Sequence, residues 1–154
     1  MNGRSSIVES TKSFWNFPCA HRRWRHHGDC ALVHGYSRSF HFTFRAHATT
    51  RNGFVVDFGS LGKIKGWLEA MFDHTLLLDE DDPLLPEFRR LEQAGACRLV
   101  TYEDVGMEGT ARMVGHSVNA MLNAMTGGRA WVRRVEVREN DKNSGVVTWE
   151  DPAN

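Results

Sequence analysis

The strongest constraint on the fold is a strict alternation of side chains between positions 34 and 44. The even-numbered side chains share one face of an extended strand, and along it they change from polar to aromatic: His34, Tyr36, Arg38, Phe40, Phe42 and Phe44. We expect the aromatic half to pack in a core and the polar half to enter a site. A preceding strand is predicted over residues 13–21, with one face carrying Trp15, Phe17, Cys19 and His21.

The rest of the chain reads as turns, helices and further strands. Asn52-Gly53 predicts a β-hairpin that returns the chain into residues 54–58. Apolar residues at helical spacing predict a first helix from about residue 61, capped by Asp57 or Ser60. The remaining predicted elements, in chain order, are an acidic loop over 76–83, a short helix near 86–94, a short strand at 99–100, a long helix ending at Gly127-Gly128, and strands over 130–139 and 145–150.

This order predicts an α+β fold, with a four-stranded antiparallel sheet covered on one face by helices. We interpret residues 1–154 as a single domain in which residues 1–12 form a disordered terminus. The exposed sheet edges favour a homo-oligomer. Trp131, Arg133, Val135, Val137 and Glu139 are predicted to share one face of the strand near the end of the chain.

Composition narrows the classes of partner. Lys plus Arg and Asp plus Glu both number 19, so no global basic field favours nucleic acid or anionic lipid. The Arg/His segment at 21–27 is therefore interpreted as a solvated loop or a triphosphate-binding surface rather than a nucleic-acid element. No apolar stretch suits a signal peptide or a membrane span, and the three cysteines follow no disulfide spacing, so we expect a cytoplasmic protein with reduced thiols.

The densest group of metal-capable side chains lies on the first two predicted strands and the loop between them: His21, His26, His27, Cys30, His34 and Tyr36. A catalytic zinc needs about three protein ligands and one open position, and His21 and His34 are the best two candidates. Spacing alone leaves ordinary solvated histidines as an alternative. Asp73-His74 is either a carboxylate that orients an imidazole or a helix-terminal charge pair.

Glu139 continues the face of Val135 and Val137, so its carboxylate is expected to point inward. A ligand with two parallel N–H donors, such as the amino-pyrimidinone edge of a pterin or guanine, would satisfy it. A neighbouring arginine, or exposure at the strand end, would satisfy it equally well.

Together these segments resemble the family of 6-carboxytetrahydropterin and 6-pyruvoyl-tetrahydropterin synthases, which have the tunnelling fold, from about Phe17 to Trp149. Five motifs stand in the family's order: Phe17-Pro-Cys-Ala-His21, Cys30-Ala-Leu-Val-His34-Gly-Tyr36, Gly53-Phe-Val-Val-Asp57-Phe58, Asp73-His74 and Val137-Arg-Glu139. The resemblance implies zinc ligands at His21 and His34, a catalytic thiol at Cys30 and a proton relay at Asp73-His74. It also implies a pterin-holding carboxylate at Glu139, and it aligns Glu108 with a second pterin-binding motif.

The chain departs from the family pattern at the third zinc histidine, where it has Tyr36. The third donor could be Tyr36 as a phenolate, or His26 or His27 from the loop. His41 is excluded, because it projects to the opposite strand face. The motif around Glu108 is altered to Val-Gly-Met-Glu-Gly, and residues 83–103 are identified as an inserted segment.

The resemblance implies a metal-dependent lyase that converts 7,8-dihydroneopterin triphosphate to 6-carboxy-5,6,7,8-tetrahydropterin, a step towards queuosine and other 7-deazaguanines. It further implies a homo-oligomeric barrel, a trimer or a hexamer of stacked trimers. The alternatives are 6-pyruvoyl-tetrahydropterin synthesis and a catalytically weak pterin- or purine-binding relative. We expect no nucleic-acid or membrane partner.

Overall fold

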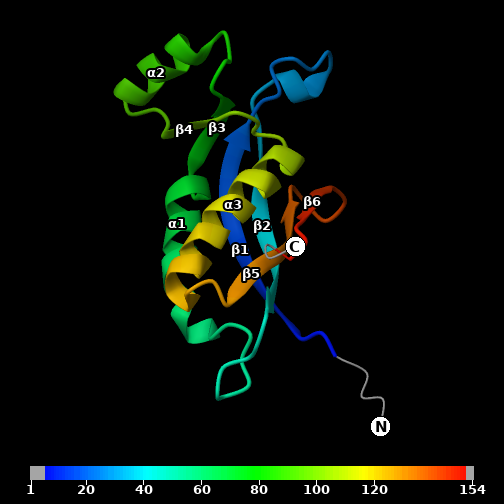
Figure 1. Cartoon of the computed structure of the whole chain (residues 1–154). Coiled ribbons are helices and arrows are strands. Elements are labelled where there is room, and N and C mark those ends of the chain that lie inside the picture. Colours follow the sequence, from blue (N-terminus) through cyan, green and yellow to red (C-terminus); the bar gives the residue numbers. More distant parts are fainter. Residues whose placement is uncertain (1–5, 152–154) are drawn as a thin grey trace.

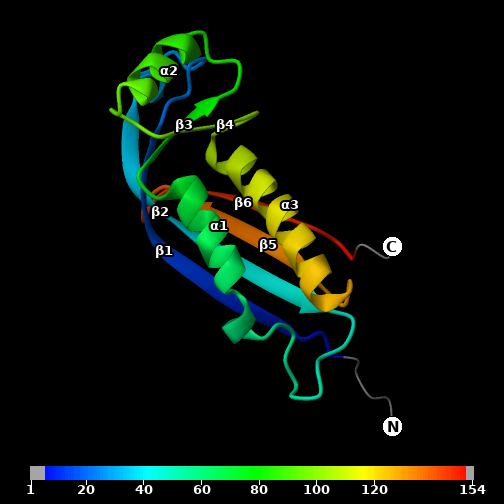
Figure 2. The ribbon, with the colours of Figure 1, turned by 90° about the vertical axis from the view of Figure 1, so that its left-hand side faces the viewer.

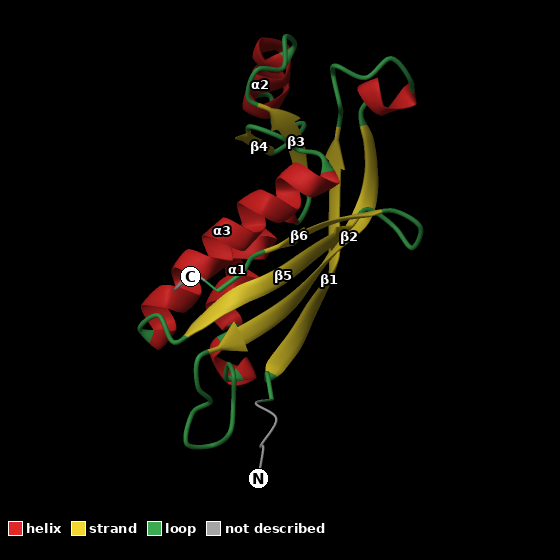
Figure 3. Cartoon of the chain, turned by 45° about the vertical axis from the view of Figure 1, so that its right-hand side comes forward, coloured by secondary structure: helices red, strands yellow, loops and turns green. Residues whose placement is uncertain are grey.

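The computed structural model describes residues 6–151, which form one mixed sheet and three α-helices (Figures 1 and 3). The strands are β1 (Glu9–His21), β2 (His34–Ala46), β3 (Thr75–Asp79), β4 (Leu99–Tyr102), β5 (Ala130–Arg138) and β6 (Ser144–Thr148). The helices are α1 (Gly62–Phe72), α2 (Leu85–Gln93) and α3 (Met107–Thr126). Within the described residues, no helix combines the length and apolarity needed to cross a membrane. β1 begins at Glu9, so residues 9–12 are part of the sheet rather than a disordered terminus.

The α+β class is confirmed, but the sheet has six strands instead of four, in the order β4-β3-β1-β2-β5-β6. The strand β3 was not predicted, β4 corresponds to the predicted short strand at 99–100, and β3 runs parallel to both of its neighbours. Every residue of β3 is buried, including the apolar run Leu76 to Leu78. A continuous apolar run is typical of a strand buried on both faces. Because such a strand has no alternation of polar and apolar side chains, the prediction that this segment is a loop is wrong. The acidic loop begins only after Asp79.

The helices α1 and α3 lie on one face of the sheet (Figure 2), and the main core lies between these helices and the strands. Phe40, Phe42 and Phe44 of β2 are at most 1% exposed and face this core, as the alternation predicts. α2 stands apart, because Leu85 and Phe88 pack instead on a small cluster of leucines from β3 and β4. The predicted strand near residue 99 and all three predicted helices are thus confirmed.

Two β-bulges change the predicted strand faces. In β1 the register shifts between Phe14 and Phe17, and Asn16 adopts a φ of 67°. The bulge turns Trp15 outward, so Trp15 is 61% exposed and the prediction that it shares the inner face is wrong. In β5 a shift opposite Thr43 and Phe44 places Val132 in the core cluster, in place of the predicted Trp131 and Arg133.

The predicted hairpin after β2 is also wrong. The turn itself forms, since Gly53 donates to the Thr50 carbonyl at 2.9 Å and has a φ of 80°. Residues 54–58 form no strand, however, because both edges of β2 are occupied by β1 and β5. Instead, Asp57 caps a short 3-10 helix, Phe58–Ser60, that leads into α1.

Candidate metal centre and active site

Three side chains converge where β1, β2 and β5 meet. His21 ends β1, His34 begins β2 as its direct cross-strand partner, and Glu139 follows the last residue of β5. Their donor atoms all lie within 4.8 Å of one another, and the centroids of the two imidazole rings are 4.4 Å apart. Among the described residues, this is the one group of histidine, cysteine and acidic side chains with the spacing of a metal site.

The separations are close to those around a bound ion. The Glu139 Oε1 atom is 3.7 Å from Nε2 of His21 and 3.9 Å from Nε2 of His34. Metal–ligand bonds of 2.0–2.2 Å in a tetrahedral zinc site place neighbouring donor atoms roughly 3.4 Å apart. A contraction of a few tenths of an ångström along these two pairs would therefore bring Glu139 into coordination distance together with each histidine.

The hydrogen bonds of the histidines suit metal binding. The Nδ1 atom of His34 lies 2.7 Å from the Leu32 carbonyl, and a carbonyl can only accept. In the neutral ring the Nδ1 atom must therefore carry the proton, and the Nε2 atom, which faces Glu139, is then the lone-pair donor. The buried Nδ1 atom of His21 makes no hydrogen bond, so one ring nitrogen of this histidine has no partner within the described part of the chain.

The electrostatic environment keeps His21 neutral. Burial of the ring, with further contributions from the Arg38 guanidinium, His34 and Arg23, lowers the pKa of His21 from 6.5 to about 3. Neutral imidazole is the form that binds metal. His21 is therefore ready to coordinate at neutral pH without first losing a proton.

Arg38 is a feature of the site that the sequence reasoning did not single out. Its side chain is 1% exposed and donates to the hydroxyl of Thr110 at 3.2 Å and to the Val105 carbonyl at 3.3 Å. No acidic side chain of the described chain forms an ion pair with it. Arg38 lies on the polar half of the alternating β2 face, and this position in the sequence indicates that its side chain points toward the site.

The predicted proton-transfer residues lie outside the metal grouping. Cys30 is an exposed thiol in a short 3-10 helix, Asp29–Ala31, between β1 and β2. The Asp73-His74 contact forms, with Oδ1 and Nδ1 2.6 Å apart, and the His74 side chain is 78% exposed. His74 has a φ of 55° and donates its backbone N–H to the Pro18 carbonyl, which is roughly 10 Å along β1 from His21.

The other candidates occupy different places. His27 is exposed and does not belong to the grouping, whereas the ring of Tyr36 stands edge-on to His34 with centroids 5.9 Å apart. His41 is hydrogen-bonded to two serines on the opposite sheet face, as the exclusion of this residue predicts. Glu108 is exposed in the first turn of α3, whose backbone packs against Gly145 of β6.

An α+β fold here brings two histidines and a carboxylate together at strand ends, an arrangement that could hold a metal ion with three donors. Comparison with known proteins identifies the family. The family model described as 6-pyruvoyl tetrahydropterin synthase matches residues 10–150. The chain belongs to this family.

Individual relatives agree with the assignment. Over 68 residues the chain is 37% identical to the 6-carboxy-5,6,7,8-tetrahydropterin synthase of Rickettsia typhi, a match that covers 44% of this chain and 49% of the relative. The chain thus spans about half the length of the curated relatives it matches. Two solved structures share the fold. An uncharacterised protein of Wolinella succinogenes has a TM-score of 0.79 at 22% identity, covering 95% of this chain and 100% of that one. The 6-pyruvoyl tetrahydropterin synthase of Caenorhabditis elegans has a TM-score of 0.65 at 17% identity, with 96% and 99% covered.

Proposed function

We propose that this chain is a metal-dependent lyase that converts 7,8-dihydroneopterin triphosphate to 6-carboxy-5,6,7,8-tetrahydropterin, in the synthesis of queuosine and related 7-deazaguanines. The observation that carries the proposal is the convergence of His21, His34 and Glu139 on one point at the strand ends. Family membership and the printed names of the curated relatives support the choice of reaction.

In this proposal His21, His34 and Glu139 hold zinc, and Glu139 supplies the donor that the family takes from a third histidine. The donor set fits, because two neutral imidazoles and one carboxylate make a common catalytic zinc site with room for an exchangeable ligand. When bound, zinc would polarise an oxygen of the substrate side chain as a Lewis acid. Tyr36, beside His34, then borders the site without serving as a ligand.

Cys30 and the Asp73-His74 pair are proposed to move protons between carbon and oxygen of the substrate. The Asp73 carboxylate accepts a hydrogen bond from His74, which fixes the orientation of the ring. These residues lie outside the metal grouping of the single chain. We propose that a homo-oligomer, a trimer or a hexamer of stacked trimers, completes the site between subunits, as the family resemblance implies. Glu108 is proposed to help bind the pterin, and the location is proposed to be cytoplasmic.

Synthesis of 6-pyruvoyl-tetrahydropterin is the second candidate, because the matching family model carries that description. Both reactions release triphosphate, but only the first also cleaves a carbon–carbon bond of the side chain. Tyr36, in place of a histidine, is the observation that would favour a third possibility, a relative that binds pterin without turnover.

Incubation of the purified, zinc-loaded protein with 7,8-dihydroneopterin triphosphate, followed by mass analysis of the pterin product, tests the proposal. We expect the mass of 6-carboxy-5,6,7,8-tetrahydropterin. The mass of the 6-pyruvoyl product would establish the second candidate. Unchanged substrate that nevertheless binds to the protein would establish the third.

A further inference from the structure

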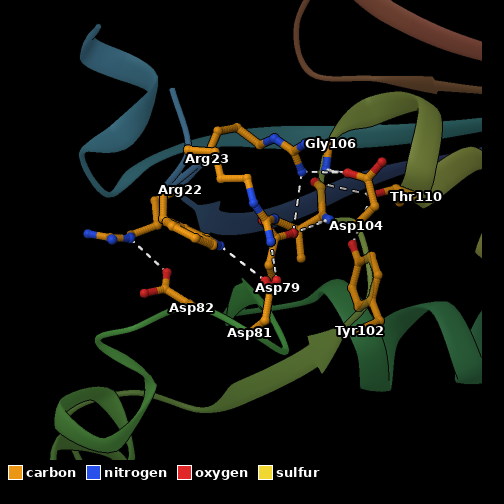
Figure 4. Close-up of polar contacts among 12 residues, drawn as sticks. Arg22, Arg23, Asp79, Asp81, Asp82, Tyr102, Asp104, Gly106 and Thr110 are labelled. Carbon is orange, nitrogen blue, oxygen red and sulfur yellow. Dashed lines mark hydrogen bonds and ion pairs between the residues drawn. The ribbon is translucent and has the colours of Figure 1, made fainter. Parts of the chain in front are cut away.

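An arginine-rich segment and an acidic segment, far apart in the sequence, neutralise each other at one end of the sheet (Figure 4). Arg22 and Arg23 follow β1 directly, and the aspartates begin with the last residue of β3. Arg22 Nε lies 2.7 Å from Asp82 Oδ2. The next residues continue the pattern, since the Trp24 indole and the Arg25 guanidinium both bond to Asp81. The arginines of this loop are therefore not a free surface for triphosphate or nucleic acid.

Arg23 is the central residue of this contact. Its Nη1 atom lies 3.3 Å from Asp79 Oδ1 and 2.5 Å from Asp104 Oδ1. Asp79, the last residue of β3, lies shortly before the inserted segment, and Asp104 is the first residue after it, so one guanidinium joins the chain on both sides of the insertion. Asp79 also accepts the backbone N–H of Val105, and Asp104 that of Gly106, both at about 3 Å.

Burial distinguishes Asp79 and Asp82 both from Asp104, whose side chain is 40% exposed, and from the exposed pair of Arg25 with Asp81. The side chains of Asp79 and Asp82 are 3% and 0% exposed, whereas those of Arg25 and Asp81 are 60% and 52% exposed. Exposed pairs contribute little to stability, while a buried carboxylate needs its partner. We use the term arginine clamp for Arg22, Arg23, Asp79, Asp82 and Asp104.

Two glycines at the start of α3 accommodate the clamp. A Cβ atom on Gly106 would lie 3.2 Å from the guanidinium carbon of Arg23. A Cβ atom on Gly109 would lie 2.3 Å from the carboxyl carbon of Asp104, which is closer than any side chain permits. These are positions at which the motif around Glu108 departs from the family pattern, so the altered motif and the clamp fit each other sterically.

The clamp is connected to Cys30 through the backbone of Arg23. The N–H of Arg23 donates to the Cys30 carbonyl at 2.7 Å, and the Arg23 carbonyl accepts from the N–H of His26 at 2.8 Å. The backbone of Arg23 therefore forms hydrogen bonds within the loop over 22–33, and its side chain binds this loop to the aspartates on both sides of the insertion.

We propose that the arginine clamp is a positioning device for Cys30, in which Arg23 transmits the rigidity of the inserted segment to the loop that carries the thiol. The inference rests on the proposed function only for the catalytic use of Cys30. The placement of the loop itself depends on the contacts described above. Arg23 is thus a positioning residue, because its side chain acts through Cys30 and not on the substrate.

The test uses the full-length protein and compares Arg23→Gln with the control Arg25→Gln, which removes the exposed pair with Asp81 and the contact of the guanidinium with the Trp24 ring. Because Arg23→Gln leaves Asp79 as a buried, unpaired carboxylate, a double variant that adds Asp79→Asn protects the fold. The amide oxygen of that asparagine can still accept the N–H of Val105. Amide hydrogen exchange over residues 26–32, zinc content, kcat and KM are measured for each protein.

We expect the double variant to exchange the amides of residues 26–32 at least about tenfold faster. We also expect kcat to fall by more than about tenfold, with KM within about threefold and zinc content unchanged, because a displaced thiol affects the chemical step. The Arg25→Gln control should match the wild type. Wild-type exchange rates in the double variant would overturn the clamp, as would a faster-exchanging loop with an unchanged kcat. If wild-type protein fails to turn over the pterin, the proposed function is refuted, and the exchange data alone then decide whether the clamp holds the loop.

Discussion

Replacement of Glu139 by glutamine separates the two roles that this carboxylate could have. The side chain is 16% exposed, and its Oε1 atom faces both histidines, while Oε2 has only a long contact of 3.4 Å with Asn143. Glutamine keeps the shape but removes the charge that binds a cation. Loss of groups that merely orient metal ligands costs 10- to 100-fold in affinity, so loss of a direct anionic donor should cost at least about 100-fold, or roughly 2.7 kcal/mol. The fold should be unaffected, because glutamine retains a side-chain oxygen that can face the buried His21.

The matched control is Glu136→Gln, which changes the same residue type three residues earlier, inside β5, at a similar exposure of 13%. Glu136 pairs with Arg134 and Arg138 and faces His41 on the opposite side of the sheet, so it should leave zinc affinity unchanged. Zinc affinity is measured by competition with a chromophoric chelator. If Glu139→Gln binds zinc as the wild type does but binds pterin 10- to 100-fold more weakly, the carboxylate anchors the pterin, and the assignment of Glu139 as the third donor is wrong.

Three further predictions concern pH, thiol reactivity and packing. In chelator-treated protein, the free energy of unfolding should fall by up to about 1.4 kcal/mol for each pH unit as the pH is lowered from roughly 6.5 to 3. The reason is that the His21 imidazole becomes protonated in the unfolded chain but stays neutral in the folded protein over this range. A stability that does not depend on pH in this range would contradict the burial of His21. At pH 8 one thiol per chain should be alkylated rapidly, and mass spectrometry should find this phase absent in Cys30→Ala, because Cys30 is exposed whereas burial raises the pKa of both Cys19 and Cys97. Gly115→Ala should destabilise the protein by about 1–3 kcal/mol in urea, because its Cβ would lie 2.0 Å from a carbon of the Trp149 indole, whereas Gly66→Ala, which meets no atom within 4 Å, should be neutral or stabilising. Equal stabilities of the two variants would refute the packing of α3 against Trp149, which follows β6.

Periodicity was sufficient to predict the elements whose two faces differ. The β2 strand alternates between buried aromatic and more polar side chains because one face meets helices and the other does not. That pattern also placed His34 on the inner face and His41 on the outer one. The helix α3 could also be predicted, because its apolar stripe ends at Gly127, which adopts the left-handed cap conformation with a φ of 62°.

Features that depend on contacts between distant segments could not be predicted in this way. The strand β3 has no alternation, because it is buried on both faces. The bulge at Asn16, which exposes Trp15, is an irregularity that a strict period of two does not reveal. Glu139 was expected to point inward, but its distance from His21 and His34 depends on how three strands end together.

The most direct test of the account is the zinc content of the purified protein, measured by elemental analysis for the wild type and for a variant that combines His21→Ala with His34→Ala. We predict about one zinc ion per wild-type chain and almost none in the double variant, which should remain folded. A wild-type protein that converts the pterin without bound metal, or a double variant that retains its zinc, would contradict the central claim that these strand ends form a catalytic metal site.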